Sequence, residues 1–226
     1  MFVFRPVSYS SGNTVSVQGI AEIKAMPDLV SVYYNIETKG KTSAEATEAN
    51  NEIYNNLVEE LILTGFEKGS LKTESFNVYP NNYWENGREK SDGYKANRYL
   101  KIEVSSEEID KLSPSIDAGV KAGAGISYIN FELSQKSQNT YKAQALKEAS
   151  EDAMIKAESI ASGFGKHAGK LVSVQTSDFG YYPWNVYSAG GISYREDVAM
   201  AKEIAMDMQP SEQRITATIT ATFRIK

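Results

Sequence analysis

The stretch SGFGKHAGK, residues 162–170, gathers three glycines, two lysines and the only histidine of the chain. Such residues could form a phosphate-binding loop, in which backbone N–H groups surround the phosphates and a lysine followed by Ser or Thr completes the site. The spacing does not match, because Gly163 and Gly169 are six positions apart and leucine follows the last lysine. A dinucleotide-binding loop would need another glycine where Ala168 stands. The spacing therefore predicts neither kind of phosphate site.

The elements around this stretch explain its glycines. We predict a long helix over about 137–163 and a strand over 171–176, whereas a phosphate loop needs a strand first and a helix second. Glycine just after a helix supplies the left-handed cap residue, and Lys166 and His167 would complement the negative end of the helix dipole. We therefore interpret the stretch as a helix cap. One alanine recurs at every fourth position of the helix: Ala145, Ala149, Ala153, Ala157 and Ala161.

Other groups of residues in the sequence give only weak evidence for catalysis or metal binding. The carboxylates of 107–110 and 148–152 are typical of solvated helix surfaces, and no serine stands in a G-x-S-x-G turn. The chain has no cysteine and one histidine, which excludes thiolate nucleophiles, disulfides and the usual zinc sites. We therefore expect no catalytic residue, no metal and no cofactor.

Charge and hydropathy limit the partners. The 24 basic and 29 acidic residues give a net charge of -5 without a basic cluster, which argues against a nucleic-acid partner. No apolar run approaches the roughly 18 residues of a membrane span, so no transmembrane segment is expected. The first residues, MFVFRPVSYSSG, lack the apolar segment of a signal peptide. Either the protein is cytosolic or a signal peptide was removed.

Alternating apolar and polar residues predict seven strands and a sheet that is antiparallel or mixed. The strands are expected at 14–19, 29–37, 74–79, 97–104, 127–133, 171–176 and 215–226. Pro27 should separate the first two strand regions, because it cannot donate to a ladder. Two further helices are expected, after capping boxes that begin at Thr42 and Ser105. Gly65 should end the first, and Pro114 should kink the second or mark a late start.

Two aromatic loops are candidates for an interaction surface. Residues 77–94 are predicted to form a hairpin with Asn86-Gly87 at its tip. Residues 179–194 contain six aromatic residues in a stretch that glycine and proline interrupt too often for a core strand. Dense exposed aromatics mark contact surfaces, although the loops could instead fold back onto their own domain. An amphipathic helix is expected over about 193–208, ending before Pro210. The candidate surface residues are Tyr83, Trp84, Tyr181, Tyr182, Trp184, Tyr187 and Tyr194.

Several stretches together resemble one family. They read VSVQGIAEIKAMPDLVSVYYNIET, GYKANRYLKIEV, KAGAGISYINFELS, ALKEASEDAMIKAESIASGFGKHAGKLVSVQ and ITATITATFRI. From Val15 on, the chain is similar to the SIMPL-domain family, bacterial periplasmic and cell-envelope proteins related to a signalling adaptor associated with a Pelle-like kinase. It departs from the family pattern at Gly125, where the family often has Asn.

The resemblance implies an α+β fold of two interlocked α/β sandwich units within one domain, 14–226. One unit would be ferredoxin-like (βαββαβ), at about 28–134, and the other would combine 14–27 with 135–226. The aromatic and Met-rich loop would cover 179–210. Similar proteins are periplasmic, are linked to stress resistance and immunogenicity, and form large homo-oligomers, which favours a removed signal peptide over a cytosolic location.

Two functional hypotheses remain open. The first is a non-enzymatic cell-envelope protein that acts through self-assembly or contact with a protein partner. The second is a small-ligand-binding protein or hydrolase that uses the aromatic loops as a pocket. The first is favoured, because the sequence shows no polar or titratable cluster beside the aromatic residues.

Overall fold

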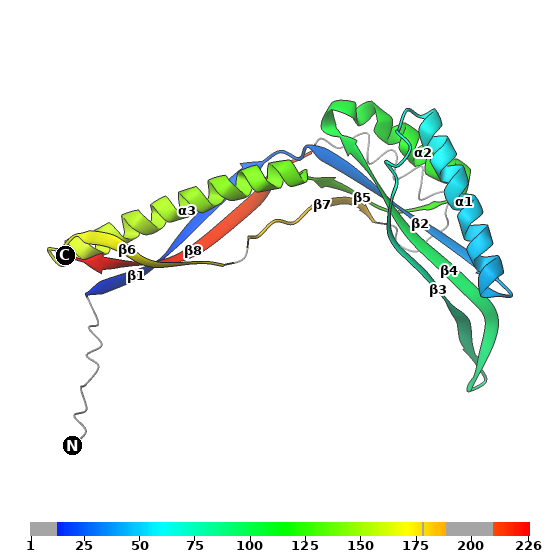
Figure 1. The fold of residues 1–226 in the computed structure, drawn as a ribbon, viewed down its shortest axis with the longest axis horizontal. Helices are drawn as coiled ribbons and strands as arrows, with labels where there is room; N and C mark the ends of the chain where they lie inside the picture. Colours follow the sequence, from blue (N-terminus) through cyan, green and yellow to red (C-terminus); the bar gives the residue numbers. More distant parts are fainter. Residues whose placement is uncertain (1–12, 178, 189–209) are drawn as a thin grey trace, which may run out of the picture. The chain divides into compact units, whose positions relative to one another are not determined.

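The computed structural model of the chain describes residues 13–177, 179–188 and 210–226. The fold class is α+β, as the sequence predicts, with three α-helices and two antiparallel sheets in these residues (Figure 1). The chain packs as two compact units. Unit 1 comprises Met1–Ala25, Gln135–Tyr182 and Glu212–Lys226, and unit 2 comprises Met26–Ser134 and Pro183–Ser211.

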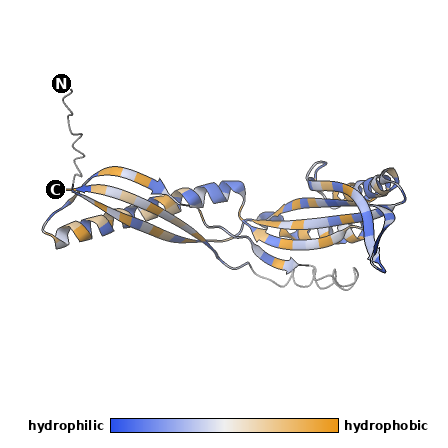
Figure 2. Cartoon of the chain, turned by 90° about the horizontal axis from the view of Figure 1, so that it is seen from below, coloured by the Kyte–Doolittle hydropathy of each residue, from blue (hydrophilic) through white to orange (hydrophobic). Residues whose placement is uncertain are grey.

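Unit 1 is a three-stranded antiparallel sheet covered on one face by one helix. The strands are β1 (Thr14–Ala25), β8 (Gln213–Ile225) and β6 (Ala168–Thr176), in the order β1-β8-β6. Helix α3 (Gln135–Gly163) packs mainly on β1 and β8. Buried and exposed residues alternate strictly along β1, and Figure 2 shows such alternation as orange and blue bands along the strands.

The alanine stripe of α3 forms the helix side of this core. All five alanines are fully buried, which confirms the four-residue spacing as the packed face. Small side chains let the helix axis approach the sheet closely, so the spacing between helix and sheet depends on them.

Replacement of Ala153 by leucine is expected to lower the free energy of unfolding by about 1 to 3 kcal/mol, because the larger side chain overpacks a filled interface. Ala143→Leu, at an exposed position of the same helix, is the matched control and should cost little. Urea denaturation measures both, and equal midpoints for the two variants would show that the stripe does not limit the packing.

Unit 2 is a five-stranded antiparallel sheet in the order β3-β4-β2-β5-β7. Its elements are β2 (Leu29–Gly40), α1 (Ser43–Leu63), β3 (Lys72–Glu85), β4 (Arg88–Ser105), the 3-10 helix η1 (Ser106–Lys111), α2 (Leu112–Ala122), β5 (Gly125–Glu132) and β7 (Trp184–Ser188). From β2 to β5 the order is βαββαβ, with the neighbouring strands arranged as in ferredoxin-like folds. Both helices cover the same face of the sheet (Figure 1).

The core of unit 2 lies between this face and the two helices. It contains fully buried side chains from strands and helices alike: Val32, Tyr34, Ile36, Leu57, Leu100, Ile102, Leu112, Ile116 and Ile129. The Tyr34 hydroxyl donates to the Ser115 carbonyl at 2.9 Å, which satisfies the one polar atom that this side chain brings into the core.

Local sequence signals explain where the elements begin and end. Thr42 caps α1 by accepting the Glu45 N–H at 3.2 Å. Helix α2 begins late, at Leu112, and its first turn contains Pro114, where the missing N–H costs nothing. Asn86 and Gly87 form the tip of the β3–β4 hairpin with φ of 52° and 73°. These signals are confirmed as predicted.

The expectation for residues 179–194 needs a correction. Trp184–Ser188 form β7, an eighth strand that pairs with β5 at the edge of the unit 2 sheet. The strand is only five residues long and contains neither glycine nor proline, so the glycines and the proline outside it did not prevent it. The turn-forming residues on both sides made this short strand unrecognisable from the local sequence, because it forms only by pairing with β5, which is distant in the sequence.

Candidate functional site

The glycine-rich stretch is a capped turn, as its position after the helix predicts. Gly165 has a φ of 68°, and the Lys166 N–H donates to the Ala161 carbonyl at 3.0 Å. Glu158 fixes the turn, because it pairs with His167 Nδ1 at 2.8 Å and accepts the N–H of the next residue at 2.8 Å. The hydrogen bond from His167, followed by the backbone one, lowers the pKa of Glu158.

The predicted hairpin aromatics are exposed. Tyr83 and Trp84 lie near the tip of the β3–β4 hairpin, with 45% and 74% of their surface exposed. The hairpin extends beyond α1 as a two-stranded ribbon (Figure 1). Tyr79, nearer the sheet on β3, is also exposed. The ribbon thus presents aromatic side chains that its own unit does not cover.

The aromatics of β7 point partly into unit 2. Tyr187 is 8% exposed and belongs to the core, while the Trp184 ring stacks on Phe131 at 5.6 Å between centroids. Strand β7 lies at one edge of the sheet and β3 at the other. These residues therefore do not converge with Tyr83 and Trp84 on one pocket.

Of the three remaining candidates of the aromatic loop, two are described by the structure and one is not. Tyr182 is 84% exposed, and Tyr181 is half-buried. Tyr194 and the helix expected over 193–208 lie outside the described residues.

A polar network in unit 2 was not found by sequence reasoning. Its centre is Glu132, which is 9% exposed and accepts four hydrogen bonds. Ser31 Oγ and Lys101 Nζ both donate to Oε2 at 3.0 Å. Tyr33 donates to Oε1 at 3.1 Å, and Asn130 Nδ2 donates to the same oxygen at 3.2 Å. Three neighbouring strands, β2, β4 and β5, thus meet at one carboxylate.

Further contacts extend the network across the sheet. Lys101 also pairs with Glu103 at 3.1 Å, and Glu103 pairs with Lys72 on β3 at 3.2 Å. On the other side, Asn185 of β7 donates to Asn130 Oδ1 at 3.0 Å. The network therefore joins all five strands of the sheet on the face opposite the two helices.

Two groups of this network, Lys101 and Tyr33, have raised pKa values. Burial alone would lower the pKa of Lys101, but hydrogen bonds to Glu132 and Glu103 outweigh it, so this pKa is raised. Burial, followed by the charge of Glu132, raises the pKa of Tyr33 to about 12. Both groups therefore keep their protons near neutral pH, so neither is available there to accept a proton as a general base. The geometry is better suited to holding the strands and presenting a surface.

These raised pKa values predict a loss of stability at alkaline pH. Above about pH 10, an unfolded tyrosine or lysine releases its proton while folded Tyr33 and Lys101 keep theirs, so unfolding becomes more favourable as pH rises. Tyr33→Phe should therefore lose less stability than the parent between about pH 10 and 12. Denaturation curves at several pH values measure this, with Tyr83→Phe as the exposed control. Parallel pH profiles for the parent and Tyr33→Phe would contradict it.

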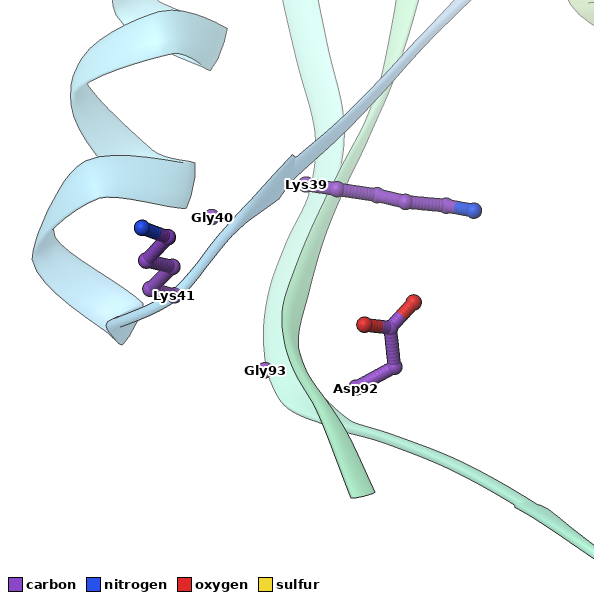
Figure 3. Close-up of a pocket in the computed structure, with 5 residues that line it drawn as sticks. All are labelled: Lys39, Gly40, Lys41, Asp92 and Gly93. Carbon is purple, nitrogen blue, oxygen red and sulfur yellow. The ribbon is translucent and has the colours of Figure 1, made fainter. Parts of the chain in front are cut away.

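A small hollow lies where β2 meets α1 and faces the start of β4. It has a volume of about 240 Å³ and is lined by Lys39, Gly40, Lys41, Asp92 and Gly93 (Figure 3). The two lysine side chains extend in different directions, so they do not converge on one anion. A Cβ at Gly93 would lie 2.2 Å from the Gly40 carbonyl oxygen, so this glycine permits close backbone packing. Within the described part of the chain, no cluster of His, Cys, Asp and Glu could hold a metal ion.

A comparison with protein families decides the assignment. The SIMPL family model, described as proteins of unknown function (DUF541), matches residues 15–223. The chain belongs to the SIMPL family. The resemblance seen in the sequence is therefore confirmed.

Relatives in this SIMPL family include proteins with little assigned function. The uncharacterized protein YggE of Escherichia coli (strain K12) is 26% identical over 173 residues, which cover 76% of this chain and 69% of that protein. The 26 kDa periplasmic immunogenic protein of Brucella melitensis is 25% identical over 219 residues, covering 94% of this chain and 84% of the relative. No helix in the described residues is long and apolar enough to cross a membrane.

Proposed function

We propose that this SIMPL protein is a non-enzymatic protein of the periplasm or cell envelope that acts by assembling with copies of itself. The name of the Brucella relative supports the compartment. One observation carries the proposal of assembly: within the described residues, no strand pairs with the outer edge of the apolar strand β6 in unit 1.

Strand β6 is exposed on both faces although it is rich in apolar residues. Leu171, Val172 and Val174 each expose about half of their surface, at 53%, 52% and 51%. Leu171 and Val174 stand opposite buried residues of β8 and therefore share the face that α3 covers elsewhere. Met154 on α3 is 59% exposed. An apolar edge of this kind is a template for another strand.

The opposite edge of the same sheet is blocked by α3. The Ile20 N–H of β1 donates to Asp152 Oδ2 at 2.8 Å, and Lys156 Nζ donates to the Gln18 carbonyl at 3.1 Å. Asp152 and Lys156 also pair with each other at 2.6 Å. Side chains of α3 thus form hydrogen bonds with the β1 backbone groups that a newly added strand would need.

The two edges of the unit 2 sheet also carry features that discourage strand addition. Strand β3 contains Pro80 and two register shifts, and β7 has only five residues. Of the four sheet edges in the described ranges, β6 is therefore the one best suited to pairing.

A second copy of this chain fits the β6 edge. Antiparallel pairing of two β6 strands about a two-fold axis perpendicular to the sheet keeps both α3 helices on the same side. Leu171 and Val174 from the two copies then meet in one apolar seam, and the threonine-rich opposite faces both remain in water. The segment 179–210 is proposed to contribute further contacts to the assembly.

Val174→Lys is expected to weaken this assembly at least about 100-fold, because two ammonium groups would be placed in the apolar seam. Light scattering coupled to size exclusion measures the mass. The parent should exceed the 25.0 kDa of one chain, and the variant should approach it.

Ile20→Lys is the matched control, since Ile20 is 53% exposed on the blocked strand β1 of the same sheet. A parent mass of one chain at all concentrations, or equal dissociation in both variants, would contradict the proposal.

Replacing residues 189–209 by a short Gly/Ser linker tests whether the segment 179–210 contributes to the assembly. That replacement keeps β7, whose removal would expose Phe131.

A further inference from the structure

The face of the unit 2 sheet opposite its helices has an unusual composition. Strand pairing places residues of the same face side by side, so that Asn35 stands opposite Tyr99, and Asn77 opposite Asn97. Three adjacent strands each contribute one tyrosine and one asparagine to this surface. We call it the Tyr/Asn face, formed by Tyr33, Asn35, Asn77, Tyr79, Asn97 and Tyr99.

The Tyr/Asn face offers rings and amides without an aliphatic centre. Tyr79 and Tyr99 are 42% and 39% exposed, and Tyr33 stacks on Tyr128 at 4.1 Å between centroids. Apart from Gly125, the further residues that stand opposite the six across the strands are also polar or aromatic: Glu37, Ser75, Lys95, Lys101 and Tyr128. Protein interfaces usually have an apolar core, so this composition favours a polar ligand with apolar C–H faces.

The charges around the Tyr/Asn face balance. Lys101 and Lys72 pair with glutamates of the network described above, and Lys95 pairs with Glu37 at 3.2 Å. The Lys and Glu residues on or beside this face number four of each: Lys39, Lys72, Lys95, Lys101, Glu37, Glu74, Glu103 and Glu132. Because no charge is in excess, the surface is not suited to recruiting a strongly charged ligand.

Two of the amides lack a hydrogen-bond donor. The Oδ1 atoms of Asn35 and Asn97 are covered and have no partner in the described structure. The terminal torsion of asparagine is broad, and a ligand would require these amides to rotate toward it. An amide offers one acceptor and two donors in a plane, which matches adjacent hydroxyl groups on a sugar ring.

We propose that the Tyr/Asn face binds a neutral oligosaccharide. The C–H faces of the sugar rings stack on Tyr79 and Tyr99, whose ring faces carry partial negative charge. The amides of Asn35 and Asn97 bind the hydroxyl groups. This site is separate from the β6 edge, which lies in unit 1.

Two neutral probes, chitohexaose and maltohexaose, test this inference by isothermal titration calorimetry, with a heparin-derived oligosaccharide as the anionic comparison. The parent should bind a neutral probe with a Kd of about 1 mM or below. Tyr99→Ala should weaken binding about three- to tenfold, because one stacking contact is lost. Tyr83→Ala is the matched control, since this exposed tyrosine lies on the ribbon outside the Tyr/Asn face.

The inference would be overturned by no binding of either neutral probe, by tighter binding of the anionic probe, or by equal loss of binding in Tyr99→Ala and Tyr83→Ala. Loss of assembly rather than of sugar binding in Tyr99→Ala would instead identify the face as a protein interface and would also overturn it. Val174→Lys should leave sugar binding unchanged, so that failure of the assembly proposal and failure of this one are distinguishable.

Discussion

Gly19→Ala is expected to lower the free energy of unfolding of unit 1 by about 3 kcal/mol, which is at the upper end of overpacking effects. Gly19 lies on β1 and faces α3. A Cβ at this position would lie 1.9 Å from the Ala149 carbonyl oxygen and 2.8 Å from the Ala153 Cβ. Since the first contact is with helix backbone, no side-chain rotation can relieve it, and the helix would have to move away from the sheet.

Gly163→Ala is the control for this change, because a Cβ there meets nothing within 4 Å. Chemical denaturation of both variants, followed by circular dichroism, measures the difference. A Gly19→Ala midpoint that matches the control would mean that α3 and β1 are not in close contact in solution.

Glu132→Ala is expected to lower the free energy of unfolding of unit 2 by about 3 kcal/mol, because it removes one partner of a nearly buried ion pair. Lys101 would keep only one carboxylate partner, Glu103, and Ser31 and Tyr33 would lose their acceptor. Polar groups left unsatisfied away from water account for most of such a cost.

Glu37→Ala provides the comparison for Glu132. Glu37 lies on the same sheet face and pairs with Lys95 in a more exposed setting, so its removal should cost at most about 1 kcal/mol. Denaturant unfolding separates the two cases. Equal losses in the two variants would show that the network contributes no more than a surface ion pair.

Most of the elements could be predicted from local patterns. Alternation located the strands, and the signals at Thr42, Gly65 and Asn86-Gly87 marked the ends of helices and the hairpin tip. These signals act within a few residues, so a single sequence contains them. Strand β7 was not predicted, because five residues between turn-forming segments become a strand only by pairing with β5.

The candidate sites were harder to predict for a related reason. Ser31, Lys101 and Glu132 lie on three strands that are far apart in the sequence, and their meeting depends on register. Alternation indicates that each residue lies on the polar side of its strand, but it does not indicate which residues stand opposite. The exposure of β6 likewise depends on where α3 crosses the sheet, which the pattern of β6 alone does not reveal.

Hydrogen exchange at β6 tests the assembly proposal most directly. Amide exchange in residues 170–177 should slow as protein concentration rises, because the second copy then occupies the free edge of the strand. The same segment in Val174→Lys should exchange at one rate at all concentrations, as should the blocked edge around Ile20 in the parent. Concentration-independent exchange of β6 in a parent protein that light scattering shows to be oligomeric would contradict the account, because the assembly would then use another surface.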